Sequence, residues 1–257
     1  MTILLLHETP KNRWTDLTNT LKRLRLIFDI ISPKEAKEFL QNGHKGRKPL
    51  LLLSTDDGFQ SNYMFCKKVL DSERIKGIFF VCPEIMNREL KDQSEMIRTN
   101  IQPPSYYGDR LMSWRELSDL QKKGHSIGSH TMSHSRLSSV SRNQIEQEVQ
   151  GSSKIIYQKT ATKPEWFAFP FGDANSITRE GLSIISKTYS YCVSGVRGSN
   201  TTSTSKFGLR RQSISVHKSS TYQLLEALGC FDYWHLKPRK KLRKLAKLQT
   251  GEENQWA

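Results

Sequence analysis

The sequence has no apolar run that approaches the roughly 20 residues a membrane-spanning helix needs. Its N-terminal apolar run, Thr2–His7, is too short for a signal peptide, and positive charges follow it instead of preceding it. We therefore expect no membrane span and no secretion signal, and a protein that starts in the cytoplasm.

Cysteine is scarce and widely spaced. The four cysteines form no CxxC pair, and several lie inside apolar runs, such as Phe79–Cys82 and Tyr191–Val193. In a chain without a secretion signal this favours buried free thiols over disulfides. The sequence also has no internal repeat.

Acidic residues are few: 25 Asp and Glu face 40 Lys and Arg, which leaves a formal net charge of +15. A field of this sign attracts phosphate, anionic lipid or acidic glycan without selecting among them. The segment Leu236–Ala257 has seven cations and two acids, so +5 of the charge lies there and +10 on the remaining chain. A nucleic-acid-binding protein is one alternative, but the sequence has no recognition motif for it, and we expect no specific nucleic acid partner.

The pattern of apolar runs and amphipathic stretches predicts repeated strand–helix units around a parallel sheet. A length of 257 residues with 36% hydrophobic residues suits one domain. Strands are expected near Ile3–Leu6, Ile27–Ile31, Leu50–Ser54, Gly77–Cys82, Ser126–Ser129, Trp166–Phe169, Tyr191–Ser194 and Gln212–Val216. Helices are expected near Trp14–Leu24, Pro33–Asn42, Ser61–Ser72, Ser113–Lys123, Ser141–Gln158 and Ile177–Thr188. The fold predicted is a single-domain α/β protein, a distorted (β/α) barrel of seven or eight strands, with a long polar insertion at Met86–Arg110 that contains Pro103 and Pro104.

Two adjacent carboxylates, Asp56 and Asp57, follow the apolar run Leu50–Leu53, and Gly58 after them can form a tight turn. Their mutual repulsion is offset by a cation or a shared proton, so one reading is a bound metal with one Asp as ligand and the other as base. The alternative is an Asp-Gly turn in which Asp57 caps the next helix.

A second cluster of polar residues closes another predicted strand. His130 and His134 are four residues apart, a spacing that can bring both imidazoles to one metal if the strand turns directly into a helix. Two His and one carboxylate form a catalytic zinc set that leaves positions open for water and substrate. The alternative is a polar surface loop. His125 points away from this cluster on an alternating strand and is expected to be a structural or surface histidine.

These residues carry a resemblance to a known family. Thr55–Gly58, His130–His134 and Phe167–Gly172 resemble, in this order, the first three motifs of the NodB-homology polysaccharide deacetylases, carbohydrate esterase family four. The resemblance extends from Leu4 to about Val216. It implies a distorted (β/α) barrel and a metal-dependent hydrolase that removes acetyl groups from N-acetylated sugars.

By this resemblance Asp56 is the general base, and Asp57, His130 and His134 are the ligands of a divalent metal, usually Zn²⁺. A metal that holds the acetyl oxygen and lowers the pKa of a water, with a carboxylate to remove the proton, is sound hydrolytic chemistry. The resemblance also implies that the backbone N–H of Phe171 helps to stabilise the oxyanion. Pro170 and Phe171 are then one wall of the substrate groove, although Phe-Pro-Phe-Gly is also an ordinary turn at a strand end.

The third motif departs from the family pattern. Most members have an arginine where Ala168 stands, and this variant resembles the deacetylases of poly-N-acetylglucosamine and envelope glycans. Arg211 is our candidate for the missing cation, with Arg210 as the second choice; a solvated basic pair is the alternative.

The general acid has no clear counterpart, because the family's Leu-x-His motif is not found. His217, at the end of the last predicted strand, is the candidate, and without it Asp56 or a water must protonate the leaving amine. His7, at the end of the first strand, matches a strand-end histidine that is common in the family and is expected to line the groove or to pack in the structure.

The sequence therefore predicts a deacetylase-like catalytic domain over residues 1–235 and a basic tail over residues 236–257. The substrate expected is an N-acetylated glycan or a lipid-linked sugar. The alternative is a metal-dependent enzyme that acts on a small amide or imide.

In the tail, Leu242, Leu245 and Leu248 form a narrow apolar stripe on a basic helix. One interpretation is that this helix lies on an anionic membrane surface at the inner face of the membrane, and the alternative is a solvated tail.

Overall fold

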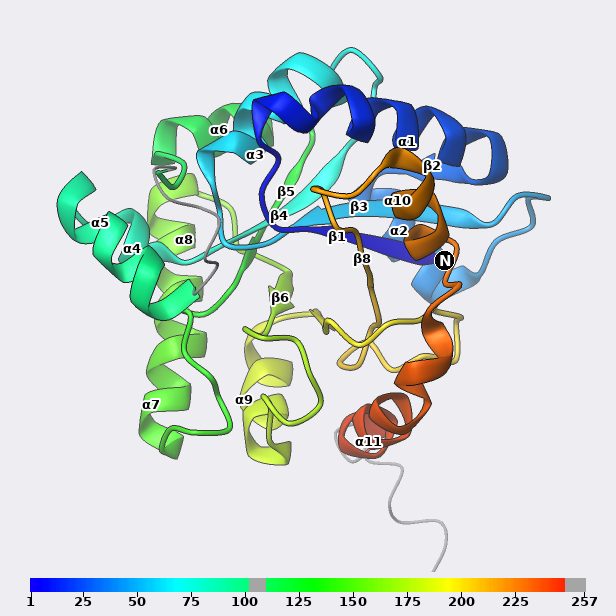
Figure 1. Cartoon of the computed structure of the whole chain (residues 1–257). Coiled ribbons are helices and arrows are strands. Elements are labelled where there is room, and N and C mark those ends of the chain that lie inside the picture. Colours follow the sequence, from blue (N-terminus) through cyan, green and yellow to red (C-terminus); the bar gives the residue numbers. More distant parts are fainter. Residues whose placement is uncertain (102–109, 248–257) are drawn as a thin grey trace, which may run out of the picture.

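The strands form one curled, all-parallel sheet (Figure 1) in a computed structural model that describes residues 1–101 and 110–247. The strand order is β7-β6-β5-β4-β3-β1-β8, and β2 pairs with β3 beside β4. The strands are β1 (Thr2–Leu6), β2 (Asp29–Ile31), β3 (Leu50–Thr55), β4 (Gly77–Val81), β5 (Ser126–Ser129), β6 (Trp166–Ala168), β7 (Tyr191–Val193) and β8 (Gln212–Ser213). The predicted α/β barrel is confirmed, and each predicted strand overlaps an observed one.

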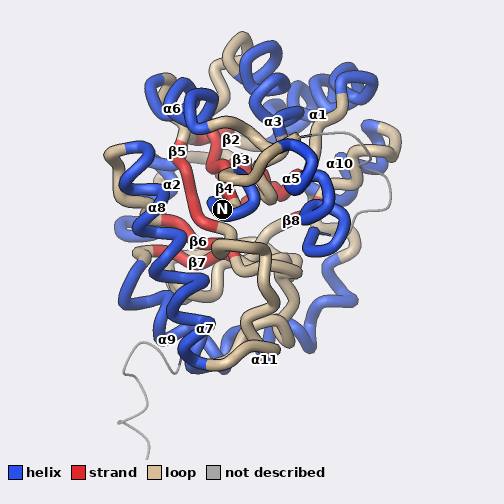
Figure 2. Tube along the Cα trace, turned by 90° about the vertical axis from the view of Figure 1, so that its left-hand side faces the viewer, coloured by secondary structure: helices blue, strands red, loops and turns tan. Residues whose placement is uncertain are grey.

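Helices surround this sheet, and the tube in Figure 2 shows them lying outside the strands. The α-helices are α1 (Trp14–Ile27), α2 (Pro33–Asn42), α3 (Gln60–Phe65), α4 (Pro83–Met86), α5 (Leu90–Met96), α6 (Trp114–Lys122), α7 (Arg142–Glu146), α8 (Ser152–Thr160), α9 (Arg179–Thr188), α10 (Ser220–Ala227) and α11 (Leu236–Lys247). Short π-helical turns continue three of them, at Cys66–Leu70, Ile97–Ile101 and Gln147–Gly151, and 3₁₀ turns occur at Lys11–Arg13 and Asp232–His235. Capping boxes start α2, α6 and α7, with serine at each N-cap.

Residues along β3 alternate between two faces of the sheet. Leu51 and Leu53 pack outward in the cluster that lies under α1 and α6, whereas Leu50 and Leu52 belong to the opposite cluster with Ile78 and Phe80 of β4. Ser54, on that second face, contacts Arg211. The interior face of β3 therefore changes from apolar to polar toward its C-terminal end, which leads into Asp56.

One segment joins the two edges of the sheet. Leu209 forms a parallel bridge with Val193 of β7, and a few residues later Gln212 and Ser213 pair with Leu4 and Leu5 of β1. Arg211 lies between these two pairings, and its side chain contacts Ser54 and Phe80 on the interior face of the sheet.

Helix α11 packs against the rest of the chain. Leu242 is 1% exposed and lies in one cluster with residues of α9 and the 137–149 region, and Leu245 packs on the same cluster. The sequence predicted the apolar stripe of this helix, but the stripe faces the protein core, so these two leucines are not available to a membrane surface. Leu248 lies outside the described residues.

The polar insertion that was predicted at Met86–Arg110 contains α5 and the π-helical turn after it; Pro103 and Pro104 lie outside the described residues.

All four cysteines are free, and Cys66, Cys82 and Cys192 are buried. Among the described helices, none has both the length and the apolar character that a membrane crossing requires.

Candidate active site

Asp56 and Asp57 directly follow β3, and both are nearly fully buried. The backbone N–H of Asp56 donates to the carbonyl of Leu6, which extends the pairing of β1 and β3 by one residue. Asp57 has a φ of 68° and Gly58 a φ of 80°, so the chain leaves the strand through two left-handed residues and points the two carboxylates in different directions.

His130 and His134 flank a loop after β5, and each is oriented by a backbone carbonyl. His130 Nδ1 donates to Ala168 at 2.7 Å, and His134 Nδ1 donates to Asn100 at 2.8 Å. Burial lowers the pKa of His130 to about 3 and lowers that of His134, so both rings are neutral and each has a lone pair on Nε2. Because a carbonyl can only accept, this tautomer follows from the hydrogen bonds.

The two lone pairs meet the carboxylate of Asp57. His130 Nε2 lies 3.5 Å and His134 Nε2 lies 3.4 Å from Asp57 Oδ1, an oxygen that is buried and has no hydrogen-bond partner among the described residues. Burial raises the pKa of Asp57 to about 7, with the charge of Asp56 adding to this effect while His7 and Arg211 oppose it. When Asp57 is ionised, all three atoms are acceptors and no donor lies among them, which fits a cation, and these three residues form a candidate metal set.

Asp56 has a different environment from Asp57. Arg211 Nη1 and Nη2 donate to the two oxygens of Asp56 at 2.6 and 2.7 Å, and Arg211 Nε donates to the carbonyl of Ser194 at 2.8 Å. Burial alone would raise the pKa of Asp56, but Arg211 and His130 outweigh it and lower this pKa to about 2. Asp56 is therefore ionised and held in one orientation, close to the candidate metal set, with His130 Nε2 3.8 Å from its Oδ2.

Phe171 forms a wall of the site. Its ring centroid is 5.1 Å from that of His134, and the guanidinium of Arg136 lies 4.1 Å from the Phe171 ring centroid. Phe171 is 44% exposed. Pro170 before it is buried. Gly172 is required after it, because a Cβ there would lie 2.5 Å from the backbone nitrogen of Gly195.

Backbone strain concentrates here. Six described residues other than glycine have a positive φ, and four of them belong to the site: Asp57, Thr131, His134 and Phe171. Such conformations cost about 1–3 kcal/mol each and persist where the surrounding structure enforces them, as at functional sites.

The two candidate histidines outside the metal set have different positions. His7 lines a cavity of about 250 Å³ together with the two aspartates and Arg211. His217 does not line it; its side chain is 53% exposed, and its Nε2 lies 3.9 Å from Glu8 Oε1. The structure therefore places His7, and not His217, beside the carboxylates.

Two supporting residues were not predicted. Glu148, in the π-helical turn after α7, accepts hydrogen bonds from the backbone of Met132 and Ser133 and from two serine hydroxyls of the loop that carries His134. Asn100, in the polar insertion, accepts from His134 and donates through Nδ2 to the carbonyl of Ser133. No motif signals either residue, since Glu148 acts through backbone amides and Asn100 partly through its own carbonyl.

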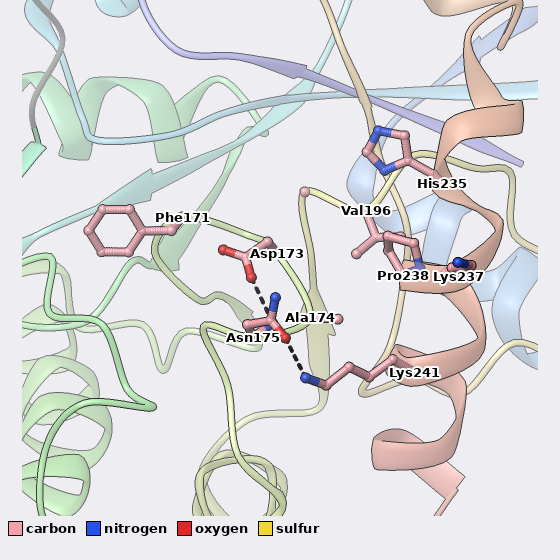
Figure 3. Close-up of a pocket in the computed structure, with 10 residues that line it drawn as sticks. Phe171, Asp173, Ala174, Asn175, Val196, His235, Lys237, Pro238 and Lys241 are labelled. Carbon is pink, nitrogen blue, oxygen red and sulfur yellow. Dashed lines mark hydrogen bonds between the residues drawn. The ribbon is translucent and has the colours of Figure 1, made fainter.

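A larger cavity of about 540 Å³ adjoins the one beside the candidate metal set, and Phe171 and Gly195 line both. It lies between the loop after β6 and α11, as Figure 3 shows, with Asn175 on one side and Lys241 on the other. Lys241 Nζ donates to Asn175 Oδ1 across it. The loop and α11 thus extend the cavity beside the candidate metal set into a groove.

A second cluster of potential ligands, Cys66, Asp71 and His125, has its hydrogen bonds and charges satisfied by the protein. His125 Nδ1 accepts from the N–H of Gly77 at 3.1 Å, and its Nε2 lies 3.1 Å from Cys66 Sγ. Burial raises the pKa of Cys66 to about 12, and Lys76 and Lys123 pair with Asp71. This cluster links β4 to its neighbouring helices.

Sequence comparison agrees with the geometry. Residues 32–189, more than half of the chain, match the polysaccharide deacetylase family, and the chain belongs to this family. The protein YlxY of Bacillus subtilis strain 168, which is uncharacterized, is 23% identical over 152 residues, 57% of this chain and 40% of YlxY. The chain spans less than half the length of the curated relatives that it matches.

Solved structures share the fold. The deacetylase PplD of Streptococcus pyogenes, in complex with acetate, has a TM-score of 0.69 at 18% identity, over 88% of this chain and 97% of its own. IcaB of Ammonifex degensii also has a TM-score of 0.69 at 18% identity, over 87% of this chain and 96% of its own.

Proposed function

We propose that the protein is a metal-dependent hydrolase that removes N-acetyl groups from a glycan or a lipid-linked sugar. The observation that carries this proposal is the meeting of three acceptor atoms, from Asp57, His130 and His134, beside the carboxylate of Asp56 that Arg211 already pairs. Membership of the polysaccharide deacetylase family supports the same reaction class, hydrolysis of amide bonds other than peptide bonds.

Asp57, His130 and His134 would hold the metal, and two neutral imidazoles with one carboxylate suit Zn²⁺. When bound, the metal polarises the acetyl carbonyl and lowers the pKa of a nearby water. The carbonyls of Ala168 and Asn100 keep the two imidazoles in the tautomer that can bind it.

Asp56 is the general base of this proposal. Arg211 keeps it ionised and fixes its two oxygens, so a proton can be taken only along the direction that the guanidinium leaves open.

The remaining roles fall to Phe171 and His7. We assign oxyanion stabilisation to the backbone N–H of Phe171, at the left-handed turn after Pro170. His7 is our candidate for the general acid that protonates the leaving amine, because it lines the catalytic cavity and His217 does not. This replaces the sequence prediction of His217.

The adjoining cavity favours a sugar over a small amide or imide. About 250 Å³ of catalytic cavity opens into about 540 Å³ between the loop after β6 and α11, which provides room for a neighbouring part of a glycan. The exposed ring of Phe171 lies between the two spaces and can pack against a sugar face.

The test is acetate release from N-acetylated oligosaccharides, compared with hydrolysis of small cyclic amides. Activity should fall to background after dialysis against a chelator and return with Zn²⁺. His134→Ala should weaken Zn²⁺ binding by more than tenfold, whereas His44→Ala, an exposed histidine outside the site, should not change it. If the protein cleaved cyclic amides and no N-acetylated sugar, its substrate would be a small amide and not a glycan. Unchanged Zn²⁺ binding in His134→Ala would refute the ligand set.

Asp56→Asn separates the base from the ligands. It should retain Zn²⁺ and the fold and lower turnover by about 100-fold or more, the usual scale for a general base. Near-normal turnover would exclude Asp56 as the base, and loss of Zn²⁺ would make it a ligand.

A further inference from the structure

A third cavity, of about 500 Å³, lies on the other side of α11 from the groove. None of its lining residues lines the catalytic cavity. Its walls are the loop at 201–205, the residue Arg210 and one face of α11. The side chains of the neighbouring residues Arg210 and Arg211 point in opposite directions, because the Arg211 side chain reaches Asp56 and the Arg210 side chain lines this cavity.

Cations dominate the lining of this cavity. It contains Arg210, Arg239, Lys240, Arg243 and Lys247 and no carboxylate among the described residues. Asp232 pairs with Arg239. Arg210, Lys240 and Arg243 form no ion pair with any residue that the structure describes, so their charges lack an anionic partner there.

The backbone of Arg210 is held in place, and its side chain is partly buried. The side chain of Asn200, itself 1% exposed, accepts from the Arg210 backbone N–H at 2.9 Å and donates to the Arg210 carbonyl at 2.8 Å. Burial first, and then the charges of Arg239 and Arg243, lower the pKa of Arg210, although Asp232 partly opposes them. An anion in the cavity would relieve this repulsion.

The cavity has hydroxyl groups and firm walls. Thr204 Oγ1 accepts from the N–H of Thr201 at 2.9 Å and from Arg210 Nη2 at 3.4 Å, which orders the loop. The loop and helix touch at Gly208, where an added Cβ would lie 2.8 Å from Ala246 Cβ. Hydroxyls and guanidinium groups are the donors that bind phosphate oxygens, and about 500 Å³ exceeds the volume of an inorganic anion.

We propose that the cavity between the 201–205 loop and α11 is a binding site for a phosphate-bearing ligand, with Arg210 and Arg243 as its main anion contacts. A walled cavity on one face of a helix suits a compact phosphate group. It does not suit a nucleic acid strand, which needs an extended basic groove with stacking residues.

The test compares two neighbouring cations of α11. Arg243 lines the cavity and Lys244 does not, while both are exposed and each loses one charge on replacement by Gln. Titration calorimetry with inorganic pyrophosphate should give saturable binding to the parent protein. Arg243→Gln should weaken it at least tenfold and Lys244→Gln less than twofold. Equal weakening in both variants, or no saturable binding, would overturn the proposal.

Two further measurements identify the source of the phosphate. Vesicles that contain phosphatidylglycerol should bind the parent and Lys244→Gln but not Arg243→Gln if the ligand is a lipid headgroup. Equal vesicle binding by all three proteins, with the pyrophosphate difference intact, assigns the site to a soluble phosphate compound. A single-stranded oligonucleotide that outcompetes pyrophosphate and loses affinity equally in both variants would show that the whole basic surface acts, and would refute the cavity as the site.

Discussion

Arg211 and Asp56, 155 residues apart in the chain, form a bidentate ion pair with two hydrogen bonds of 2.6 and 2.7 Å. The arginine is 1% exposed and is held by the carbonyl of Ser194, and its guanidinium lies 5.5 Å from the ring centroid of Phe80. Ala168, where the family resemblance led us to expect an arginine, contributes its backbone carbonyl to His130. A cation from the other end of the chain therefore lies beside the carboxylate of Asp56, which we propose as the general base.

We predict that Arg211→Lys lowers turnover and shifts the acidic limb of the pH–rate profile to higher pH. Arg211 lowers the pKa of Asp56, and an ammonium cannot donate two parallel hydrogen bonds, so Asp56 would protonate at a higher pH. Arg142→Lys, at an exposed pair with Glu146 and Glu180, is the control and should leave the profile unchanged. An unaltered acidic limb in Arg211→Lys would mean that another group orients the base.

We predict that Glu148→Gln weakens Zn²⁺ binding by about tenfold, the lower end of the effect of outer-shell partners. One carboxylate oxygen accepts from the backbone N–H groups of Met132 and Ser133 and the other from two serine hydroxyls, and an amide would replace one of these two acceptors by an N–H donor. Glu146→Gln, two residues earlier and paired with Arg142, is the matched control. Metal titration measures both variants, and equal affinities would show that the His134 loop does not depend on Glu148.

We predict that His7→Gln lowers turnover by about 100-fold or more, the usual scale for a general acid, whereas His217→Gln leaves turnover unchanged. A general acid gives its proton to the leaving amine, and a glutamine side chain has no such proton to give. His7 lines the catalytic cavity, and His217 lies beside Glu8 on the surface. The reverse result would return the acid to His217, and no effect in either variant would leave the protonation to Asp56 or to water.

Much of the fold was predictable because local signals agree with the tertiary structure. The helix Pro33–Asn42 has a capping box with Pro at its first position, and the strand Ser126–Ser129 lies between clear turn signals, so both were predicted with their observed bounds. The last strand was predicted as Gln212–Val216 and ends at Ser213. There the backbone N–H of Ser215 donates to Glu226 at 2.7 Å instead of continuing the ladder, a contact that no periodicity shows.

The candidate site was predictable only where side chains carry the chemistry. Asp56, Asp57, His130 and His134 stand in recognisable motifs, and the structure brings all four together. The carbonyls of Ala168 and Asn100, which orient the imidazoles, are present on every residue and leave no mark in the sequence. The burial of α11 was missed because its stripe of leucines suits a membrane surface and a protein core equally well.

We predict that Leu242→Ala lowers the free energy of unfolding by about 2–5 kcal/mol, the usual cost of removing a large buried side chain. Leu242 is 1% exposed and packs into the same cluster as Leu182 and Ile185 of α9, so its loss would leave a void between the two helices. Lys244→Ala, exposed on the same helix, is the control and should change the stability by less than about 0.5 kcal/mol. Urea unfolding of both variants measures the difference. If Leu242→Ala were as stable as the parent, residues 236–247 would be an independent tail; a large loss makes α11 part of the catalytic domain and a permanent wall of the groove.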